Sequence, residues 1–195
     1  MLGKGIGTYF REKNAQTISL SGDIRLSTPH LKSILTKGLL STGIDIIDLG
    51  IVPTPVNYYS MYVLPVDGAI QITGSHNPPE FNGFKICVGY DSIHGTQIQE
   101  LRKIMEAGAY LSGSGKQKIQ DITGDYQNYI LDHVKIKRKL KVVLDAGNGV
   151  GGKFAVPILE KMGCDLTCLY CDPDGRFPNH FPDPTVEDHL KDIIK

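Results

Sequence analysis

Residues 69–85 read Ala-Ile-Gln-Ile-Thr-Gly-Ser-His-Asn-Pro-Pro-Glu-Phe-Asn-Gly-Phe-Lys, and this stretch carries more information than any other part of the chain. Its first four residues have the pattern of a short apolar strand, and the residues that follow predict a loop with Ser75 at its tip. His76, Asn77 and a stiff proline pair come directly after the hydroxyl, and Lys85 lies a little further on. The stretch therefore predicts an exposed, reactive oxygen with acid–base and cationic groups beside it.

The bulk composition excludes several classes of partner. At 195 residues the chain can form one large domain or two small ones with a sizeable core. Lys and Arg together number 21, as do Asp and Glu, so the overall charge is zero. This balance argues against nucleic acid or another polyanion as a partner. There is no apolar run long enough to span a bilayer and no signal-peptide layout, which predicts no membrane association and a cytoplasmic location. The four cysteines would be reduced there.

Strand and helix patterns alternate along the chain, which predicts an α/β fold of two α/β/α domains with mainly parallel sheets, the second incomplete. The stretch 108–124 is rich in Gly and Ser and is interpreted as the boundary between domains 1–117 and 118–195. The chain begins with what reads as the middle or exit of a helix and ends on a helix pattern over 186–195, so we expect a fragment of a longer protein. We expect strands near 18–22, 44–49, 68–73, 83–88, 140–145 and 165–170, helices near 29–42, 54–63, 97–107, 126–134 and 152–162, and a loop over 172–184.

A glycine-rich turn, Gly147-Asn-Gly-Val-Gly-Gly152, lies between a predicted strand and a predicted helix, with Asp172 further on. The pattern matches a dinucleotide site, in which glycines let a pyrophosphate approach a helix N-terminus. Against that interpretation, Asp145 puts a carboxylate close to where the phosphates would lie. A NAD-dependent dehydrogenase built on Gly147–Gly152 therefore stays an alternative beside a plain turn. A phosphate-binding P-loop is excluded, because Phe154 stands where its Ser or Thr belongs.

Cys164, Cys168 and Cys171 have the spacing of thiolates that hold an iron–sulfur cluster. Three thiolates hold a cluster only if they converge, whereas side chains alternate faces along a strand. Cys168 and Cys171 would then project to opposite sides of the strand predicted over 165–170. We interpret these cysteines, and Cys87 likewise, as small buried residues of the core.

The chemistry around Ser75 suits phosphoryl transfer. A hydrolase elbow would need glycines where Thr73 and Asn77 stand. The loop follows the carboxyl end of a predicted parallel strand, where such sheets place ligands. A phosphoserine carries about −1.5 to −2 charge at neutral pH, which Mg²⁺ and basic side chains such as His76 and Lys85 would balance. The alternative is a surface turn with an incidental serine.

The segment Thr73-Gly-Ser-His-Asn-Pro-Pro-x-x-Asn-Gly-Phe-Lys85 resembles the active-site loop of the α-D-phosphohexomutases, and specifically that of the phosphomannomutase/phosphoglucomutase group. Segments at 22–27, 52–59, 145–149 and 177–184 resemble segments of the same family in the same order. The similarity therefore covers essentially the whole chain.

The resemblance implies an enzyme that interconverts hexose 1-phosphate and hexose 6-phosphate through a phosphoserine at Ser75 and a bisphosphorylated sugar, with hexose 1,6-bisphosphate as activator. It implies that His76 touches the reacting group and that Lys85 is a general acid–base and phosphate contact. Mg²⁺ would be bound by the phosphate on Ser75 and by three Asp of a later loop. We expect Arg25 to order the loop through hydrogen bonds to its backbone, with Asn77 as further support.

Several parts of the family pattern do not occur in these residues: an N-terminal Arg-x-Tyr-Asp-x-Arg-Gly strand, the Asp-rich metal loop, and the sugar- and phosphate-binding loops of domains III and IV. We therefore expect domain I and the first part of domain II of such a mutase, with a poor Mg²⁺ site and little or no activity of the chain alone. A non-catalytic truncation product is a further alternative. The rival within the class is phosphoglucosamine mutase, whose loop typically has Ala where this chain has Gly74.

Overall fold

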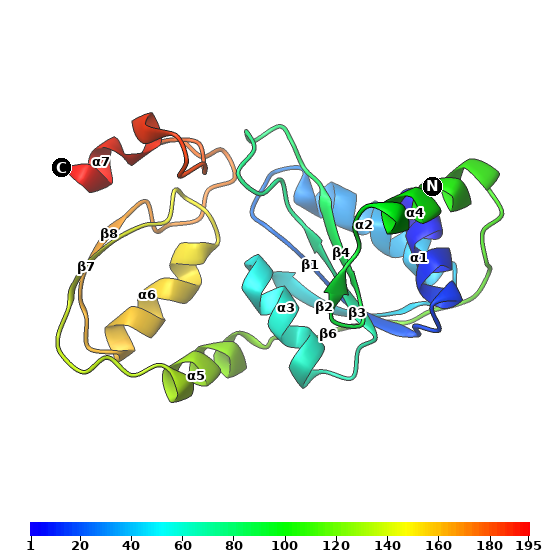
Figure 1. Ribbon diagram of the computed structural model, residues 1–195, viewed down its shortest axis with the longest axis horizontal. Helices are drawn as coiled ribbons and strands as arrows, with labels where there is room; N and C mark the ends of the chain where they lie inside the picture. Colours follow the sequence, from blue (N-terminus) through cyan, green and yellow to red (C-terminus); the bar gives the residue numbers. More distant parts are fainter.

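The computed structural model describes all 195 residues and shows two α/β units (Figure 1). The first unit contains a six-stranded sheet of order β5-β4-β3-β1-β2-β6, in which β4 pairs antiparallel with β3 and β5 and all other pairs are parallel. Its strands are β1 (Thr17–Gly22), β2 (Asp45–Ile51), β3 (Gly68–Ile72), β4 (Phe84–Val88), β5 (Asp91–Ser92) and β6 (Gln117–Ile119). Its helices are α1 (Leu2–Glu12), α2 (Thr28–Leu40), α3 (Thr54–Val63) and α4 (Thr96–Ala107).

Helices cover both faces of this sheet, and the residue alternation along β1 shows why. Ile18 and Leu20 belong to the main apolar core, which they share with residues of α1, α2 and α4. Ser19 and Ser21 point the other way and form hydrogen bonds with side chains of α3. All four side chains are buried, as parallel strands between two helical layers require. Because β1 pairs in parallel with β2 and β3, the carboxyl ends of all three strands lie at one edge of the sheet, and the Ser75 loop projects from this edge.

An edge strand occupies part of the stretch that the sequence predicted to be a boundary. β6 pairs in parallel with β2, so the first sheet extends to Ile119, beyond the expected limit at 117. The glycines of this stretch serve close packing: a Cβ at Gly115 would lie 2.0 Å from the carbonyl oxygen of Ile44. Composition alone predicted a domain boundary here because it does not distinguish flexible glycines from packed ones.

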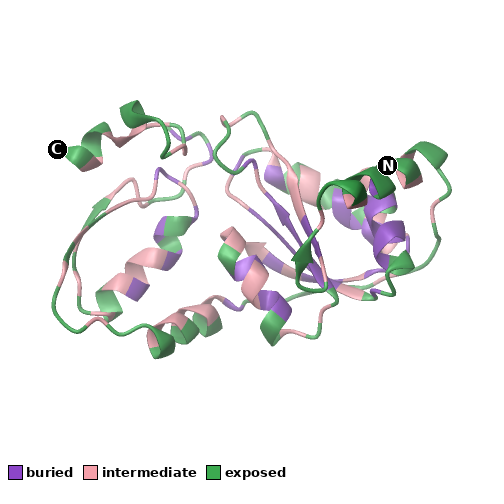
Figure 2. Ribbon diagram, in the orientation of Figure 1, coloured by how far each residue is buried: buried purple, intermediate pink, exposed green.

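The second unit contains α5 (Thr123–His133), β7 (Lys141–Asp145), α6 (Gly151–Lys161) and β8 (Asp165–Leu169), and its two strands are paired in parallel. Few of its residues are buried, and Figure 2 shows that burial is concentrated in the first unit. The helix expected over 186–195 is broken into η1 (Glu187–Leu190) and α7 (Lys191–Ile194). The predicted α/β class with mainly parallel sheets is confirmed. None of the helices combines the length and apolar character needed to cross a bilayer.

A second apolar cluster joins the two units. Val52 and Val56 from the first unit pack in it together with Val150 and Phe154 from the second. Tyr59 of α3 adds an aromatic contact to α5, where its ring lies 5.5 Å from that of Tyr126. The two units are therefore held together by shared buried apolar surface.

Cys87 is buried, as predicted, but the other three cysteines are not core residues. Cys168 is exposed, since the outer part of β8 lies open to solvent. The prediction for Cys168 and Cys171 assumed that both lie in one strand, but β8 ends at Leu169, so Cys171 lies beyond it, and its thiol contacts Leu169 O (3.6 Å) and Leu144 O (3.9 Å). Burial, and then the contact with Cys168, raises the pKa of Cys171 to about 12. The three cysteines do not converge as cluster ligands must, since no group of three or more His, Cys, Asp or Glu side chains is placed to hold a metal ion.

Candidate functional site

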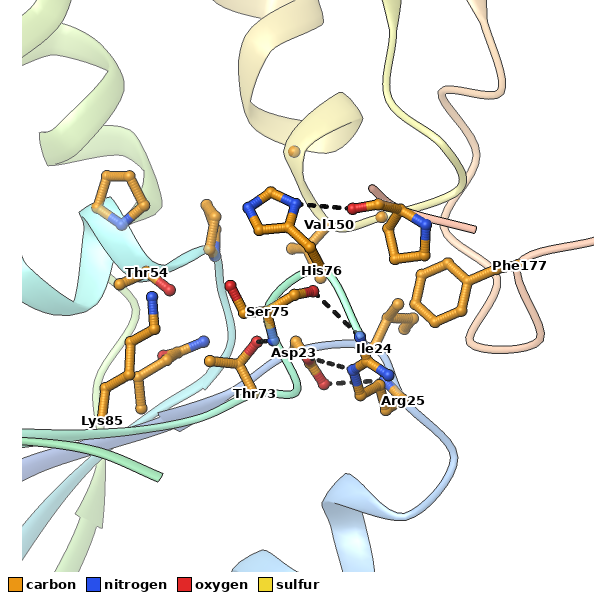
Figure 3. A pocket seen from close by; sticks show the side chains of 16 residues that line it. Asp23, Ile24, Arg25, Thr54, Thr73, Ser75, His76, Lys85, Val150 and Phe177 are labelled. Carbon is orange, nitrogen blue, oxygen red and sulfur yellow. Dashed lines mark hydrogen bonds and ion pairs between the residues drawn. The ribbon is translucent and has the colours of Figure 1, made fainter. Parts of the chain in front are cut away.

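A cavity of about 410 Å³ lies where the carboxyl ends of β1 and β3 face the second unit (Figure 3). Ser75, His76, Lys85 and Arg25 all line it. The structure thus brings together four residues that the sequence singled out. Asn77 belongs to the same loop, and its side-chain amide donates a hydrogen bond to Gly74 O (2.9 Å), which fits the expected supporting role.

Ser75 is held at the loop tip in a left-handed backbone conformation, with φ +55°. This conformation is costly for a residue with a Cβ and persists only where the surroundings impose it. The backbone N–H of Ser75 donates to Thr73 Oγ1 (3.0 Å), and the N–H of Asn77 closes a turn on Gly74 O (3.0 Å). The side chain is exposed, so its hydroxyl oxygen is open to the cavity.

Arg25 holds the loop from below. Its side chain is fully buried, and its guanidinium donates to four loop carbonyls, those of Ser75, Asn77, Pro78 and Phe81. The hydrogen bonds expected from the sequence are therefore present. Arginine suits this role because its planar group carries five donors in a fixed geometry, so one side chain can order several carbonyls of a loop.

Asp23 completes this support, and the sequence reasoning assigned it no role. Its carboxylate accepts hydrogen bonds from Arg25 Nε (3.1 Å), Thr28 Oγ1 (2.8 Å) and the backbone N–H of Gly74 (3.3 Å). It balances the buried charge of Arg25 and also fixes the start of the loop. Asn82, also not assigned a role, ties the far end of the loop to Thr28 Oγ1 (3.1 Å). The available signal was that Asp23 directly follows β1 at the edge where ligands bind.

Lys85 is the cation with no carboxylate partner in this cavity. It lies on β4 directly opposite Gln71 of β3, and both side chains line the cavity. None of the ion pairs of the chain includes it. Figure 3 shows its side chain rising from the sheet toward Thr54 and Ser75. An unpaired ammonium next to an exposed serine is suited to bind an anionic group.

The second unit supplies the opposite wall through Gly149–Gly151, Phe177 and Pro182. Pro182 O lies 2.8 Å from His76 Nδ1, so the residue next to Ser75 contacts both units. Phe177 is buried, and its ring lies against the Arg25 guanidinium, with 5.3 Å from the ring centroid to Cζ.

The glycine-rich turn does not have the expected features of a dinucleotide site. The carboxylate of Asp145 accepts the backbone N–H of Gly147 (2.8 Å) and contacts His180 Nε2 (3.0 Å). The backbone N–H of Gly147 therefore donates to a carboxylate of the protein and is not free to bind a phosphate. A Cβ at Gly152 would lie 2.3 Å from Cys171 O, so this glycine allows close packing of α6 against the segment after β8.

Comparisons with known proteins agree on one family. Family models for phosphoglucomutase/phosphomannomutase match the chain, alpha/beta/alpha domain I over residues 1–112 and domain II over 124–195. The phosphoglucomutase of Neisseria meningitidis is 40% identical over 196 residues, which cover 100% of this chain and 43% of that protein. The phosphomannomutase/phosphoglucomutase of Pseudomonas aeruginosa is 42% identical over 193 residues, 99% of this chain and 42% of that protein.

Solved structures give the same result. A phosphoglucomutase/phosphomannomutase family protein from Burkholderia thailandensis superposes with a TM-score of 0.93 at 40% identity, covering 99% of this chain and 44% of that one. The chain therefore spans less than half the length of the relatives it matches.

Proposed function

The chain belongs to the phosphoglucomutase/phosphomannomutase family, and from that premise we propose that Ser75 is the phosphoryl carrier of an enzyme that interconverts hexose 1-phosphate and hexose 6-phosphate. The observation that carries the proposal is the support of Ser75: an exposed hydroxyl on a left-handed residue, in a loop whose carbonyls are held by the buried Arg25. An incidental turn serine would not need a buried charged group to maintain its conformation.

The proposed reaction is a pair of phosphoryl transfers. In the first, the O–P bond to Ser75 breaks as an O–P bond to a sugar hydroxyl forms; a base takes the hydroxyl proton, and an acid protonates the serine oxygen. The bisphosphorylated sugar then reorients and returns its other phosphoryl group to Ser75. Such transfers depend mainly on positioning and on neutralising the charge of the transferred group.

We assign Lys85 and His76 to the neutralisation of the phosphoryl charge and to proton transfer. Both line the cavity with Ser75, and the ammonium of Lys85 has no carboxylate partner. We propose Lys85 as the phosphate contact and general acid–base group, and His76 as a contact of the reacting phosphoryl group. We do not assign Arg25 as a substrate contact, because its guanidinium N–H groups already donate hydrogen bonds to loop carbonyls. It acts by ordering the loop backbone.

Mg²⁺ and a hexose 1,6-bisphosphate activator are part of the proposal for the whole enzyme, but these 195 residues do not fit a metal site. No group of three or more His, Cys, Asp or Glu side chains is placed to hold a metal ion. A phosphate on Ser75 would supply one ligand, whereas Mg²⁺ takes about six in near-octahedral geometry. We propose that the remaining ligands and the sugar contacts come from other residues of the same polypeptide, including domains III and IV, and that the chain alone has little or no mutase activity.

A coupled assay tests the proposal. The full-length protein that contains this chain should convert glucose 1-phosphate or mannose 1-phosphate to the 6-phosphate in the presence of Mg²⁺ and the bisphosphate. The 195-residue chain should show little turnover in the same assay. Failure of the full-length protein with both sugars would refute the mutase assignment, and robust turnover by the 195 residues would refute the need for further domains.

Gly74 favours this assignment over phosphoglucosamine mutase, because the alanine typical of that group would collide with Arg25 here. Glucosamine 6-phosphate in the same assay distinguishes the two, since it should be the poorer substrate. The NAD-dependent dehydrogenase alternative predicts enhanced NADH fluorescence on titration with the chain, which we expect not to occur. The alternative of a non-catalytic truncation product concerns the 195-residue chain alone and predicts no turnover by it, even with Mg²⁺ and the bisphosphate.

A further inference from the structure

A segment of the second unit, Asp174–Asp183, lies against the Ser75 loop; we refer to it as the strap. Its Gly175 comes so close to the first unit that a Cβ there would lie 2.2 Å from Ile24 O. Phe177 and Pro182 of the strap line the cavity with Ser75. The strap therefore contacts the first unit within the proposed site, although more than 100 residues separate His76 from Pro182.

The contact with His76 determines which ring nitrogen is available to the cavity. Pro182 O lies 2.8 Å from His76 Nδ1 and, as a carbonyl oxygen, can only accept a hydrogen bond. The hydrogen must then reside on Nδ1, and the neutral ring presents the lone pair of Nε2. The strap thus orients the imidazole beside Ser75 and selects its tautomer.

The contact with Arg25 acts on the other side of the loop. Phe177 is 6% exposed and adopts φ +49°, while its ring lies against the guanidinium that holds the loop carbonyls. Four of the five non-glycine residues with positive φ, namely Ser75, Asn148, Tyr170 and Phe177, lie in the loop, the strap or the segments that hold the strap. Strained backbone of this kind persists only where surrounding contacts impose it, and it gathers at functional sites.

Two side chains anchor the strap to the second unit. Asn179 donates a hydrogen bond to Asn148 Oδ1 (2.7 Å). His180 Nε2 lies 3.0 and 3.1 Å from the carboxylate oxygens of Asp145, and its Nδ1 lies 2.8 Å from Phe181 O. Asp145 is in turn bound by the N–H of Gly147, so the anchor reaches the end of β7. None of these anchor side chains lines the cavity.

We propose that the strap is a positioning element of the phosphoryl-transfer site, and that His180, through Asp145, is the positioning residue that keeps Pro182 O on His76 Nδ1 and Phe177 on Arg25. This inference rests on the proposed function for its effect on turnover, but not for its effect on His76. Without the anchor, the strap carbonyl moves away from His76, and the imidazole samples both tautomers and other rotamers. The reaction then slows although no group that touches the substrate has been removed.

The first experiment needs no activity. Long-range ¹H–¹⁵N correlation of the histidine-labelled 195-residue chain at about pH 8, where an ordinary imidazole is neutral, reports the tautomer of each ring, and His76→Asn assigns the signal. We expect His76 to be an Nδ1–H tautomer in the original chain and a mixture in His180→Ala. His180→Gln, which keeps a donor near the position of Nε2, should restore the single tautomer. The matched control is His133→Ala, because His133 bonds only Tyr129 O on exposed α5.

The second experiment measures turnover of the full-length protein with the same variants. His180→Ala should lower kcat roughly 10- to 100-fold with little change in KM, His180→Gln should recover most of the loss, and His133→Ala should match the unsubstituted protein. If His180→Ala unfolds, the original chain and His180→Gln decide: an Nε2–H or mixed His76 in either of them overturns the inference. An unchanged His76 signal and unchanged kcat in a folded His180→Ala variant also overturn it. An inactive unsubstituted enzyme refutes the proposed function, whereas the NMR result still decides whether the strap orients His76.

Discussion

A Cβ atom at position 74 would lie 2.5 Å from Cζ of Arg25 and 2.7 Å from Phe81 O. The glycine before Ser75, the proposed phosphoryl carrier, is therefore required by the buried arginine beneath it. Arg25 cannot move aside, because its donors hold four loop carbonyls and Asp23. Gly74 and Arg25 thus form one structural unit on which the geometry of Ser75 depends.

Replacing Gly74 by Ala should destabilise the chain by about 1–3 kcal/mol, because the added methyl group overpacks a site bounded by a buried side chain and backbone. The measurement is the urea midpoint of the 195-residue chain. The control is Gly124→Ala, since a Cβ there meets nothing within 4 Å in helix α5. The control should be neutral or slightly stabilising. Equal midpoints for the two variants would contradict the close approach of Gly74 to Arg25.

Replacing Arg25 by Lys should loosen the Ser75 loop. The ammonium keeps the charge opposite Asp23 but cannot reach four carbonyls, so the amides of residues 74–77, 80 and 81 should exchange with solvent faster. Arg25→Met should cost more, on the order of 3–5 kcal/mol, because Asp23 is left without its partner. Hydrogen exchange and urea denaturation measure the two effects. Arg102→Lys is the control, since the exposed Arg102–Glu106 pair should contribute under about 1 kcal/mol.

Replacing Ser75 by Ala should lower turnover of the full-length protein by at least about 1,000-fold, because the proposed phosphoryl carrier is lost. The stability of the chain should change by less than about 0.5 kcal/mol, since the loop is held through the backbone N–H and C=O of Ser75. Intact mass after incubation with hexose 1,6-bisphosphate should show one phosphoryl group on the unsubstituted enzyme and none on the variant. A phosphorylated Ser75→Ala protein would refute the assignment of the carrier.

Thiol reactivity should differ among the cysteines. Burial raises the pKa of Cys171 to about 12, so at about pH 8 roughly one thiol in ten thousand is ionised. Cys168 is exposed and should react first with iodoacetamide, whereas Cys171 should react slowly and faster as pH rises. Mass spectrometry of peptides after timed labelling gives the order. Labelling of Cys171 as fast as that of Cys168 at neutral pH would contradict the raised pKa.

The strap should respond to acid through Asp174. Hydrogen bonds from the Arg176 side chain and backbone lower the pKa of Asp174 to about 2. A lowered pKa means that the interaction is fully present above the ordinary aspartate value and is lost as pH falls from about 4 toward about 2. Carboxyl ¹³C titration of Asp174 should therefore show a midpoint near 2. Arg176→Gln should return the midpoint toward the ordinary value, and a normal midpoint in the unsubstituted chain would contradict the pairing.

Features built from residues close together in the sequence could be predicted, whereas contacts between residues far apart in the sequence could not. The Ser75 loop was predictable because its strand, turn residues and basic groups are contiguous in residues 69–85. Asp23 was missed because its hydrogen bond to Gly74 joins residues 51 positions apart. β6 was missed because three residues with an exposed side-chain pattern carry almost no periodic signal, and only pairing with β2 makes them a strand.

The sequence by itself determined the α/β class, the family and the serine that we propose as carrier, because each depends on local periodicity or on a contiguous motif. Only the tertiary structure decided how that serine is held. The Arg25 clamp was anticipated, but its dependence on Asp23 and on the bare backbone of Gly74 follows from side-chain packing. The contact of Pro182 O with His76 likewise exists only because two units share a buried apolar interface, which brings a loop of the second unit onto the first.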